Sequence, residues 1–353
     1  MITNKIIKTA RLSALSIALA SCPLTLTAPA YAGSPTDLPG NSTCQNLQIP
    51  VALNDGEATN YTISGTYCTP RHWAGNQQRV DVLIHGGTYS QSYWDFPAGQ
   101  QYSYVFRTLQ AGRATFAYDQ IGTGTSSHPL STSVTANGAA YVAHQVVQHF
   151  RSTGKGVNIV GHSIGAYLAI REAGTYHDVD AVVVTGALHV PEVLPTVGAE
   201  FNADMYPATS DPLFAGQNLD AGYLTTTPGT RASLFYDTRF ADAKVITADE
   251  AHKAFMSATL AYDTLADLAT PAAYNISQSV TAPVLIIVGA NDSVMCTAGV
   301  DCSRAGILAR ERAFFPNAAS LSAISVANTG HDLTLHYSAP YSFGLINSWL
   351  NSR

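Results

Sequence analysis

Short apolar runs alternate with segments of helical spacing along most of the chain. Strands are predicted where Val, Ile and Leu form runs or alternate with polar residues. Helices are predicted where apolar residues recur every three or four positions. The expected strands are 61–67, 80–84, 114–118, 157–160, 179–185, 283–288 and 321–326. The expected helices are 102–109, 141–150, 164–173, 304–314 and 341–350.

The order of these segments predicts the fold class. Most expected strands are continuous apolar runs, which is typical of parallel strands covered by helices on both faces. The alternation stops near residue 189 and resumes near residue 283, and helical spacing between them is confined to 199–206 and 248–268. We therefore expect an α/β core of residues 33–188 and 280–353, with an inserted, largely helical cap of residues 189–279.

The first 32 residues have the order of a cleaved secretory signal. A basic start precedes an apolar run at 12–20, and the segment ends in Ala30-Tyr31-Ala32, a small-x-small cleavage pattern. The apolar run is too short for a helix that spans a membrane. An alternative is a lipoprotein box at residues 19–22, which would anchor the chain through Cys22, although Pro23 disfavours it.

The net charge of the chain limits the kinds of molecule that we expect it to bind. The chain has 18 Lys and Arg against 24 Asp and Glu, and removal of residues 1–32 moves the net charge from −6 to −9. No basic run remains, so we expect no nucleic-acid partner and no stable membrane insertion. The expectation is a secreted monomer, extracellular or periplasmic, that acts on a small apolar molecule.

Four cysteines follow residue 32, and an exported chain meets an oxidising compartment that favours disulfides. Of the three possible pairings we expect Cys44 with Cys68 and Cys296 with Cys302. No metal site is expected, because none of these cysteines lies in a C-x-x-C pair and no H-E-x-x-H spacing occurs.

The strongest chemical signal is Gly161-His162-Ser163-Ile164-Gly165, between an expected strand and an expected helix. A serine in this G-x-S-x-G setting lies on a tight turn with its hydroxyl above the sheet. Because a serine hydroxyl is a weak nucleophile, it needs a base in contact and a carboxylate to orient that base. Ser163 is the expected nucleophile, and His162 beside it is expected to be structural.

Asp292 and His331 are the expected partners of the serine. Both follow expected strands, so they should reach the same sheet edge as the serine, in the chain order Ser, Asp, His. The sequence leaves rivals open for both positions: Glu192, Asp301 and Asp332 for the acid, and His336 for the base.

Oxyanion donors are expected at two backbone positions. One is the amide of Ile164, which follows the nucleophile, and the other is the amide of Gly87 in His85-Gly86-Gly87-Thr88. The alternative for the second donor is Thr88.

Substrate contacts are expected from aromatic residues after the oxyanion loop and in the cap. Tyr89, Trp94, Tyr206 and Phe214 are the expected contacts. The same two segments also contain Tyr93, Phe96, Phe201, Met205, Leu213 and Tyr223.

Together these motifs resemble the α/β-hydrolase superfamily, in particular its secreted, capped esterase and lipase-like members. The matching pieces are Leu83-Ile84-His85-Gly86-Gly87, the Gly-rich turn at 118–126, the Ser163 turn, Gly289-Ala290-Asn291-Asp292 and Gly330-His331. The resemblance implies an eight-stranded, mainly parallel sheet, a Ser–His–Asp triad and no cofactor. It makes cleavage of carboxylic esters the expected function. A peptidase, aminopeptidase or lactonase of the same fold is the alternative, and a non-catalytic binding protein is the least favoured.

Overall fold

The central sheet has eight strands in the order β1-β2-β4-β3-β5-β6-β10-β11. The computed structural model describes residues 38–75, 78–297 and 299–353, so the expected signal of residues 1–32 and Cys22 lie outside the described residues. The strands are β1 (Thr43–Val51), β2 (Tyr61–Thr69), β3 (Arg79–Ile84), β4 (Ala114–Tyr118), β5 (Gly156–His162), β6 (Ala181–Thr185), β10 (Val284–Gly289) and β11 (Leu321–Val326).

All pairings from β4 to β11 are parallel, whereas β1 pairs with β2 and β2 with β4 in antiparallel fashion. The expected mainly parallel sheet of eight strands is confirmed. Strand β1 was not expected, because it is an edge strand with a largely exposed, polar sequence that includes Pro50. Cys44 and Cys68 are register partners across β1 and β2 and form a disulfide.

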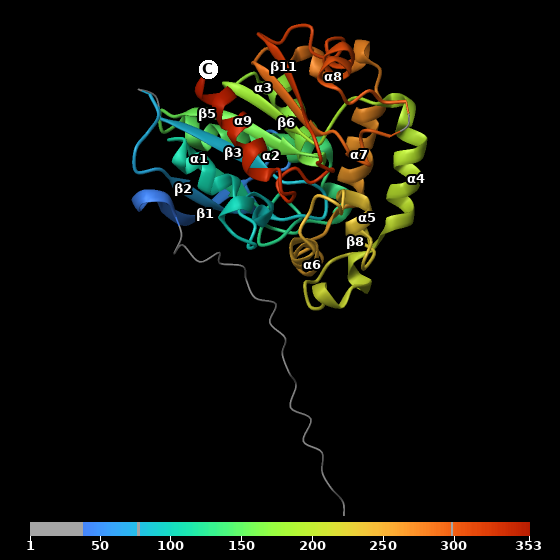
Figure 1. Cartoon of the computed structure of the whole chain (residues 1–353). Helices are drawn as coiled ribbons and strands as arrows, with labels where there is room; N and C mark the ends of the chain where they lie inside the picture. The colour runs from blue at the N-terminus through green and yellow to red at the C-terminus, as the bar shows by residue number, and fades with distance from the viewer. Residues whose placement is uncertain (1–37, 76–77, 298) are drawn as a thin grey trace, which may run out of the picture. The chain divides into compact units, whose positions relative to one another are not determined.

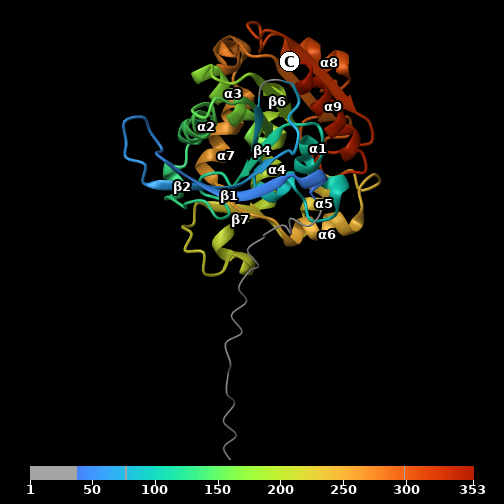
Figure 2. The same ribbon diagram turned by 90° about the vertical axis from the view of Figure 1, so that its left-hand side faces the viewer.

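Helices cover both faces of the sheet (Figure 2). Val82 and Ile84 of β3 pack with α2 and α3, whereas Leu83 between them packs with α1 and α9. This alternation places an apolar layer on each face, as a buried parallel sheet requires. The helices of the core are α1 (Tyr104–Gln110), α2 (Ala136–Arg151), α3 (Ile164–Tyr176), α8 (Arg304–Glu311) and α9 (Ala339–Asn351).

The chain between β6 and β10 contains the segment that the sequence predicts as a cap, and this segment is called the cap below; it is coloured from yellow-green to orange in Figure 1. It holds a small antiparallel sheet in the order β7-β8-β9. Its main elements are α4 (Leu194–Asp204), β7 (Met205–Pro207), β8 (Tyr223–Thr226), α5 (Arg231–Phe235), α6 (Ala243–Ala251), β9 (Met256–Ser257) and α7 (Ala258–Ala269).

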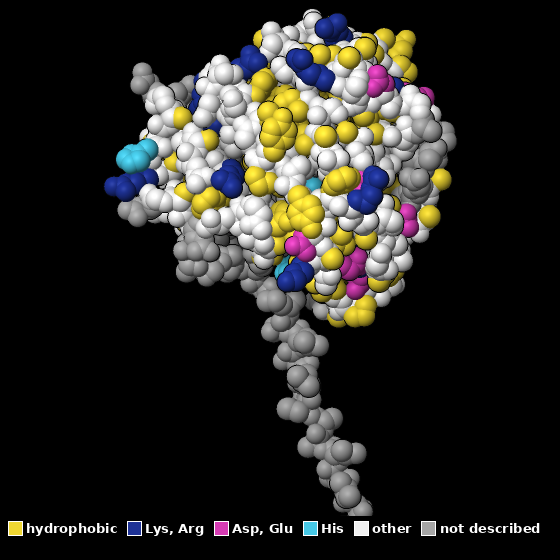
Figure 3. Space-filling model, in the orientation of Figure 1, with side chains coloured by type: hydrophobic (Ala, Val, Ile, Leu, Met, Phe, Trp, Pro, Cys, Tyr) yellow, Lys and Arg dark blue, Asp and Glu magenta, His cyan; other side chains and the backbone are white. Residues whose placement is uncertain are grey.

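The helix expected over 248–268 is two helices separated by β9. Met256 pairs with Leu224 of β8, and the Ser257 hydroxyl accepts a hydrogen bond from the Leu260 amide as the N-cap of α7. Within the described residues, no helix combines the length and the apolar character needed to cross a bilayer. On the face drawn in Figure 3, Lys and Arg side chains lie apart from one another and form no basic patch.

Candidate active site

Ser163 lies on a strained turn between β5 and α3. Its φ of 52° and ψ of −122° are unusual for a residue with a side chain, and such strain is common at functional sites. The turn requires the flanking glycines. A Cβ on Gly161 would lie 2.2 Å from the Gly165 carbonyl oxygen, and one on Gly165 would lie 2.4 Å from the His85 oxygen. The close packing of α3 on the sheet therefore fixes where the Ser163 hydroxyl projects.

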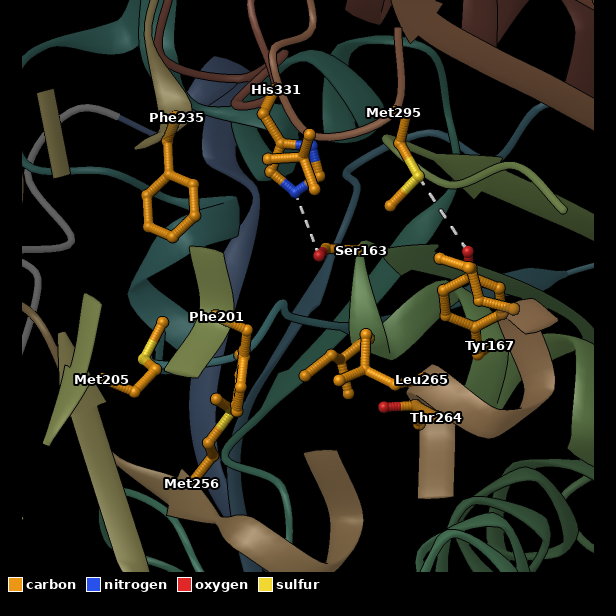
Figure 4. A pocket seen from close by; sticks show the side chains of 14 residues that line it. Ser163, Tyr167, Phe201, Met205, Phe235, Met256, Thr264, Leu265, Met295 and His331 are labelled. Carbon is orange, nitrogen blue, oxygen red and sulfur yellow. Dashed lines mark hydrogen bonds between the residues drawn. The ribbon is translucent and has the colours of Figure 1, made fainter. Parts of the chain in front are cut away.

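The structure brings Ser163, His331 and Asp292 into one line of hydrogen bonds. His331 Nε2 lies 3.0 Å from Ser163 Oγ (Figure 4). On the other side of the ring, His331 Nδ1 lies 2.9 Å from Asp292 Oδ2. The Asp292 Oδ1 atom accepts hydrogen bonds from the amides of Val294 and Met295. Both partners of the serine are almost fully buried, so the line of hydrogen bonds is shielded from water.

The acid and histidine loops meet because β10 ends in a glycine. A Cβ on Gly289 would lie 2.2 Å from the carbonyl oxygens of Thr329 and Gly330. The disulfide between Cys296 and Cys302 closes the chain immediately after the acid loop, and the Cys296 amide donates to the Asp292 carbonyl. The position of Asp292 is thus held from both sides.

The pKa of His331 is raised above its ordinary value of 6.5. Burial alone lowers it, but the charge and hydrogen bond of Asp292, with the charge of Asp332, favour the imidazolium more strongly. The neighbouring His162 is different, because burial and the charge of His331 hold its pKa well below the ordinary value. Of the two imidazoles, His331 is the one suited to accept a proton from the serine.

The rival acids and the rival base lie elsewhere. Glu192 forms an ion pair with Arg310, and Asp301 accepts a hydrogen bond from the amide of Ser303, the N-cap of α8. His336 accepts hydrogen bonds from the amides of Gly330 and Asp237 at Nε2, so its ring supports the histidine loop.

The two residues expected to supply oxyanion amides lie at the same pocket as the serine. Gly87, which follows β3, and Ile164, the first residue of α3, both line the pocket that contains Ser163. Neither amide donates a hydrogen bond to any acceptor among the described residues. Thr88, the alternative, has a φ of 61° and its hydroxyl is bonded to Arg231.

The pocket beside Ser163 is small and apolar, with a volume of about 90 Å³. Its wall includes three methionines, which are all the methionines of the chain except Met1. Figure 4 shows side chains of the cap facing the serine across this space. The lining residues are Gly87, Ser163, Ile164, Tyr167, Phe201, Met205, Phe235, Met256, Thr264, Leu265, Leu268, Val294, Met295 and His331.

The four aromatic residues expected to contact substrate do not line this pocket. Tyr89 and Trp94 are buried behind the oxyanion loop, where they pack with core aromatics. Phe214 is buried in a separate cap cluster, and the Tyr206 hydroxyl binds Asp211. Large aromatic side chains that lie near a site in sequence are readily used for packing, as these four are.

Phe201 and Met205, which the sequence analysis also noted in the cap segment, do line the pocket. Sequence reasoning missed most of the other wall residues, including Tyr167, Phe235, Met256, Leu265 and Met295. Their helical or strand spacing is the same as that of core residues, so no sequence signal distinguished them.

A buried arginine of the cap forms an ion pair within the cap and a hydrogen bond to the expected oxyanion loop. Arg231 of α5 is fully buried and binds both carboxylate oxygens of Asp249 at 2.9 Å. A third nitrogen, Nη1, donates to the Thr88 hydroxyl at 2.9 Å. The guanidinium also lies over the Tyr89 ring, 4.2 Å from its centroid. The backbone of the oxyanion loop is therefore fixed by a cap residue that the sequence analysis did not identify.

Asp332 is also part of this network and lies beside His162. It accepts a hydrogen bond from the Tyr89 hydroxyl, and its other oxygen lies 3.3 Å from His162 Nε2. Burial raises the pKa of Asp332, against the lowering effect of the charges of His331 and Arg231. Because its two oxygens lie against Tyr89 and His162, Asp332 is not part of the line of hydrogen bonds formed by Ser163, His331 and Asp292.

Comparisons with known proteins agree with this architecture. The model of the alpha/beta hydrolase family matches residues 82–342. A search of curated protein sequences finds no match. An E-2-(acetamidomethylene)succinate hydrolase is similar in structure, with a TM-score of 0.56 at 18% identity over 88% of this chain and 100% of that one.

Two further solved structures are similar at low identity. A soluble variant of monoglyceride lipase from Saccharomyces cerevisiae has a TM-score of 0.57 at 14% identity, over 85% of this chain and 95% of that one. A carboxyl esterase from Bacillus coagulans has a TM-score of 0.56 at 13% identity, over 88% of this chain and 98% of that one. At these identities the likeness concerns the fold, whereas the family match spans most of the sequence. The chain belongs to the alpha/beta hydrolase family.

Proposed function

We propose that this protein is a serine hydrolase that cleaves carboxylic esters through an acyl-enzyme. The observation that carries the proposal is the line of hydrogen bonds from Asp292 through His331 to Ser163. A hydroxyl on a strained turn, in contact with an imidazole that a buried carboxylate orients, is the arrangement needed for nucleophilic attack on a carbonyl.

In the proposed mechanism Ser163 attacks the ester carbonyl while His331 Nε2 takes the hydroxyl proton. Asp292 orients the imidazole through Nδ1 and stabilises the imidazolium that forms. The amides of Gly87 and Ile164 bind the oxyanion of the tetrahedral intermediate. His331 then gives its proton to the leaving alcohol, and a water activated by the same imidazole releases the acid and restores Ser163.

The pocket supports a substrate with a compact apolar acyl group. A water-sized group needs about 10–15 Å³ by the same kind of measure, so a volume of about 90 Å³ admits several such groups and favours a short acyl chain. The methionine-rich wall favours apolar contact over directional hydrogen bonds. Esterases and lipases among the solved structures of similar fold support the same substrate class.

We further propose that the protein acts outside the cytoplasm. Two disulfides in the described residues suit an oxidising compartment, and the expected signal at residues 1–32 is consistent with export. Detection of the mature chain in culture medium or periplasmic extract, with an N-terminus at residue 33, would test both points. A mature chain that starts at Cys22 would instead favour the lipid anchor.

Esters of increasing acyl length, aminoacyl anilides and lactones, assayed with the wild type and with Ser163→Ala, test the activity. We expect ester hydrolysis with a preference for short acyl groups, and a loss on the order of 10⁶ in turnover in Ser163→Ala. A fluorophosphonate probe should label the wild type at Ser163. Faster cleavage of anilides or lactones would replace the proposed substrate class, and no labelling with no turnover would favour a non-catalytic binding protein.

A further inference from the structure

Four polar atoms without hydrogen-bond partners converge between α2 and the end of α3. They are Nδ1 of His144, both carboxylate oxygens of Glu172 and Oδ1 of Asp178. The Glu172 side chain is fully buried, and those of His144 and Asp178 are 23% and 13% exposed. A buried carboxylate that accepts no hydrogen bond is costly, so a cation or a proton is needed to offset its charge.

The spacing of the atoms is compatible with metal ligation. Nδ1 of His144 lies 2.8 Å from Oδ2 of Asp178 and 3.9 Å from Oε1 of Glu172, and Nδ1 has no hydrogen-bond geometry to either. Ligand atoms from the three side chains all lie within 4.8 Å of one another. Ligands at the tetrahedral angle of Zn²⁺ are about 3.3 Å apart, so the observed separations bracket that value.

Neighbouring side chains orient two of the three groups, His144 and Asp178. The Tyr176 ring stacks on the His144 imidazole with centroids 3.9 Å apart and an interplanar angle of 17°. The Gln148 amide donates a hydrogen bond to Oδ2 of Asp178, while Oδ1 has no hydrogen-bond partner. Support of this kind around the ligands holds metal sites in shape.

We propose that His144, Glu172 and Asp178 form a Zn²⁺ site that ties α2 to the end of α3. An imidazole with two carboxylates suits Zn²⁺, whereas Ca²⁺ and Mg²⁺ take oxygen ligands. The two carboxylates neutralise the ion, and the exposed side of His144 and Asp178 leaves a position for water. Glu172 lies nine residues after Ser163, about 13 Å along α3, so the ion is structural and takes no part in ester cleavage.

The test begins with the full chain stripped of metal by a chelator and dialysed. Titration with Zn²⁺ should give one ion per chain in a calorimeter and a thermal midpoint that rises with Zn²⁺ concentration. Glu172→Gln and His144→Gln should each weaken Zn²⁺ binding by at least about tenfold. The matched controls are His149→Gln on the same helix and Glu192→Gln on the cap side, and both should bind Zn²⁺ as the wild type does.

Three results would overturn the site. One is the absence of stoichiometric Zn²⁺ binding with Glu172→Gln as stable as the wild type, which means a proton shared between the two carboxyl groups. Another is binding that persists in both ligand variants, which places Zn²⁺ at other histidines. The third is binding of Ca²⁺ in preference to Zn²⁺. Ester hydrolysis, assayed below the melting temperature of the metal-free form, should be the same with and without Zn²⁺, so a failure of the metal site leaves the proposed function untouched.

Discussion

The two sides of the pocket are held by different kinds of interaction. On the core side, Ser163, Asp292 and His331 follow β5, β10 and β11, and directional hydrogen bonds of 2.8–3.0 Å fix them. On the cap side, Phe201, Met205, Met256 and Leu265 form a wall without directional contacts, and many apolar side chains could fill the same space. The first arrangement is suited to precise chemistry and the second to adaptable binding.

This difference indicates that the cap side of the pocket determines which substrates fit, whereas the core side determines the chemistry. A substitution on the core side removes a hydrogen bond that no other residue can replace, whereas a substitution on the cap side alters the shape of the pocket. The buried Arg231 is the exception, because it is a cap residue that binds the oxyanion loop through directional contacts. Substitutions on each side should therefore differ in size and in the kinetic constant they affect.

The largest effect in this comparison is expected from Asp292→Asn. The amide can hold the His331 ring in place but favours the wrong tautomer, so kcat should fall by about 10⁴ with little change in the melting temperature. Steady-state kinetics with a short-chain ester provide the measurement. Asp301→Asn, an exposed rival in the adjacent loop, should leave kcat near that of the wild type. If Asp292→Asn keeps more than about a hundredth of kcat, Asp292 is not the orienting acid.

Arg231→Met tests whether the cap depends on its buried ion pair. The variant leaves Asp249 buried without its partner, so the free energy of unfolding should fall by about 3–5 kcal/mol in a urea titration. Arg239→Met is the matched control, since Arg239 also pairs with an aspartate of the cap but is 71% exposed, and its removal should change stability little. Equal effects of the two variants would show that the Arg231 contacts do not fix the cap.

Leu265→Ala tests the apolar wall. Widening the pocket should raise kcat/KM for the next longer acyl chains relative to short ones by about 10–200-fold. The control is Leu130→Ala, because Leu130 is 67% exposed and lies outside the pocket. An unchanged acyl-length profile in Leu265→Ala would place the acyl group elsewhere.

The smallest expected effect is a shift in the pH dependence of kcat/KM. Because the pKa of His331 is raised, its imidazole stays protonated to a higher pH than a free imidazole does, and only the neutral form can take the Ser163 proton. The acidic limb of kcat/KM should therefore have its midpoint above 6.5, measured from about pH 5 to 9. In Asp292→Asn the main cause of the rise is lost, so the midpoint should move to lower pH. A midpoint at or below 6.5 in the wild type would argue against His331 as the base.

The core was readable from sequence because its function requires particular residues in particular places. The turn at Ser163 needs two glycines, and parallel strands bring their carboxyl ends to one edge, so chain order and strand ends favoured Asp292 and His331 while leaving rivals open for both. Strand β1 was missed because an exposed edge strand lacks the apolar pattern. The break before α7 was missed because pairing of Met256 with β8 overrides helical spacing.

The residues of the pocket wall and of the polar clusters could not be predicted from the sequence, for a related reason. Apolar residues that line a cavity and those that fill a core have the same spacing, so Tyr89 and Trp94 were chosen where Met256 and Leu265 belong. Arg231 is a single cation whose partners, Thr88 and Asp249, are distant in sequence. His144, Glu172 and Asp178 likewise match no ligand motif, because the packing of α2 on α3 brings them together.

The concentration of methionines around Ser163 has a consequence that follows from the proposed location outside the cytoplasm, where the protein would meet oxidants. Peroxide converts a thioether into a polar, chiral sulfoxide, which suits an apolar cavity poorly. Met205, Met256 and Met295 face the same small space, so their oxidation should weaken ester binding while the hydrogen bonds around His331 stay intact. Oxidative damage would then appear first as a rise in KM, and methionine sulfoxide reductase should reverse it.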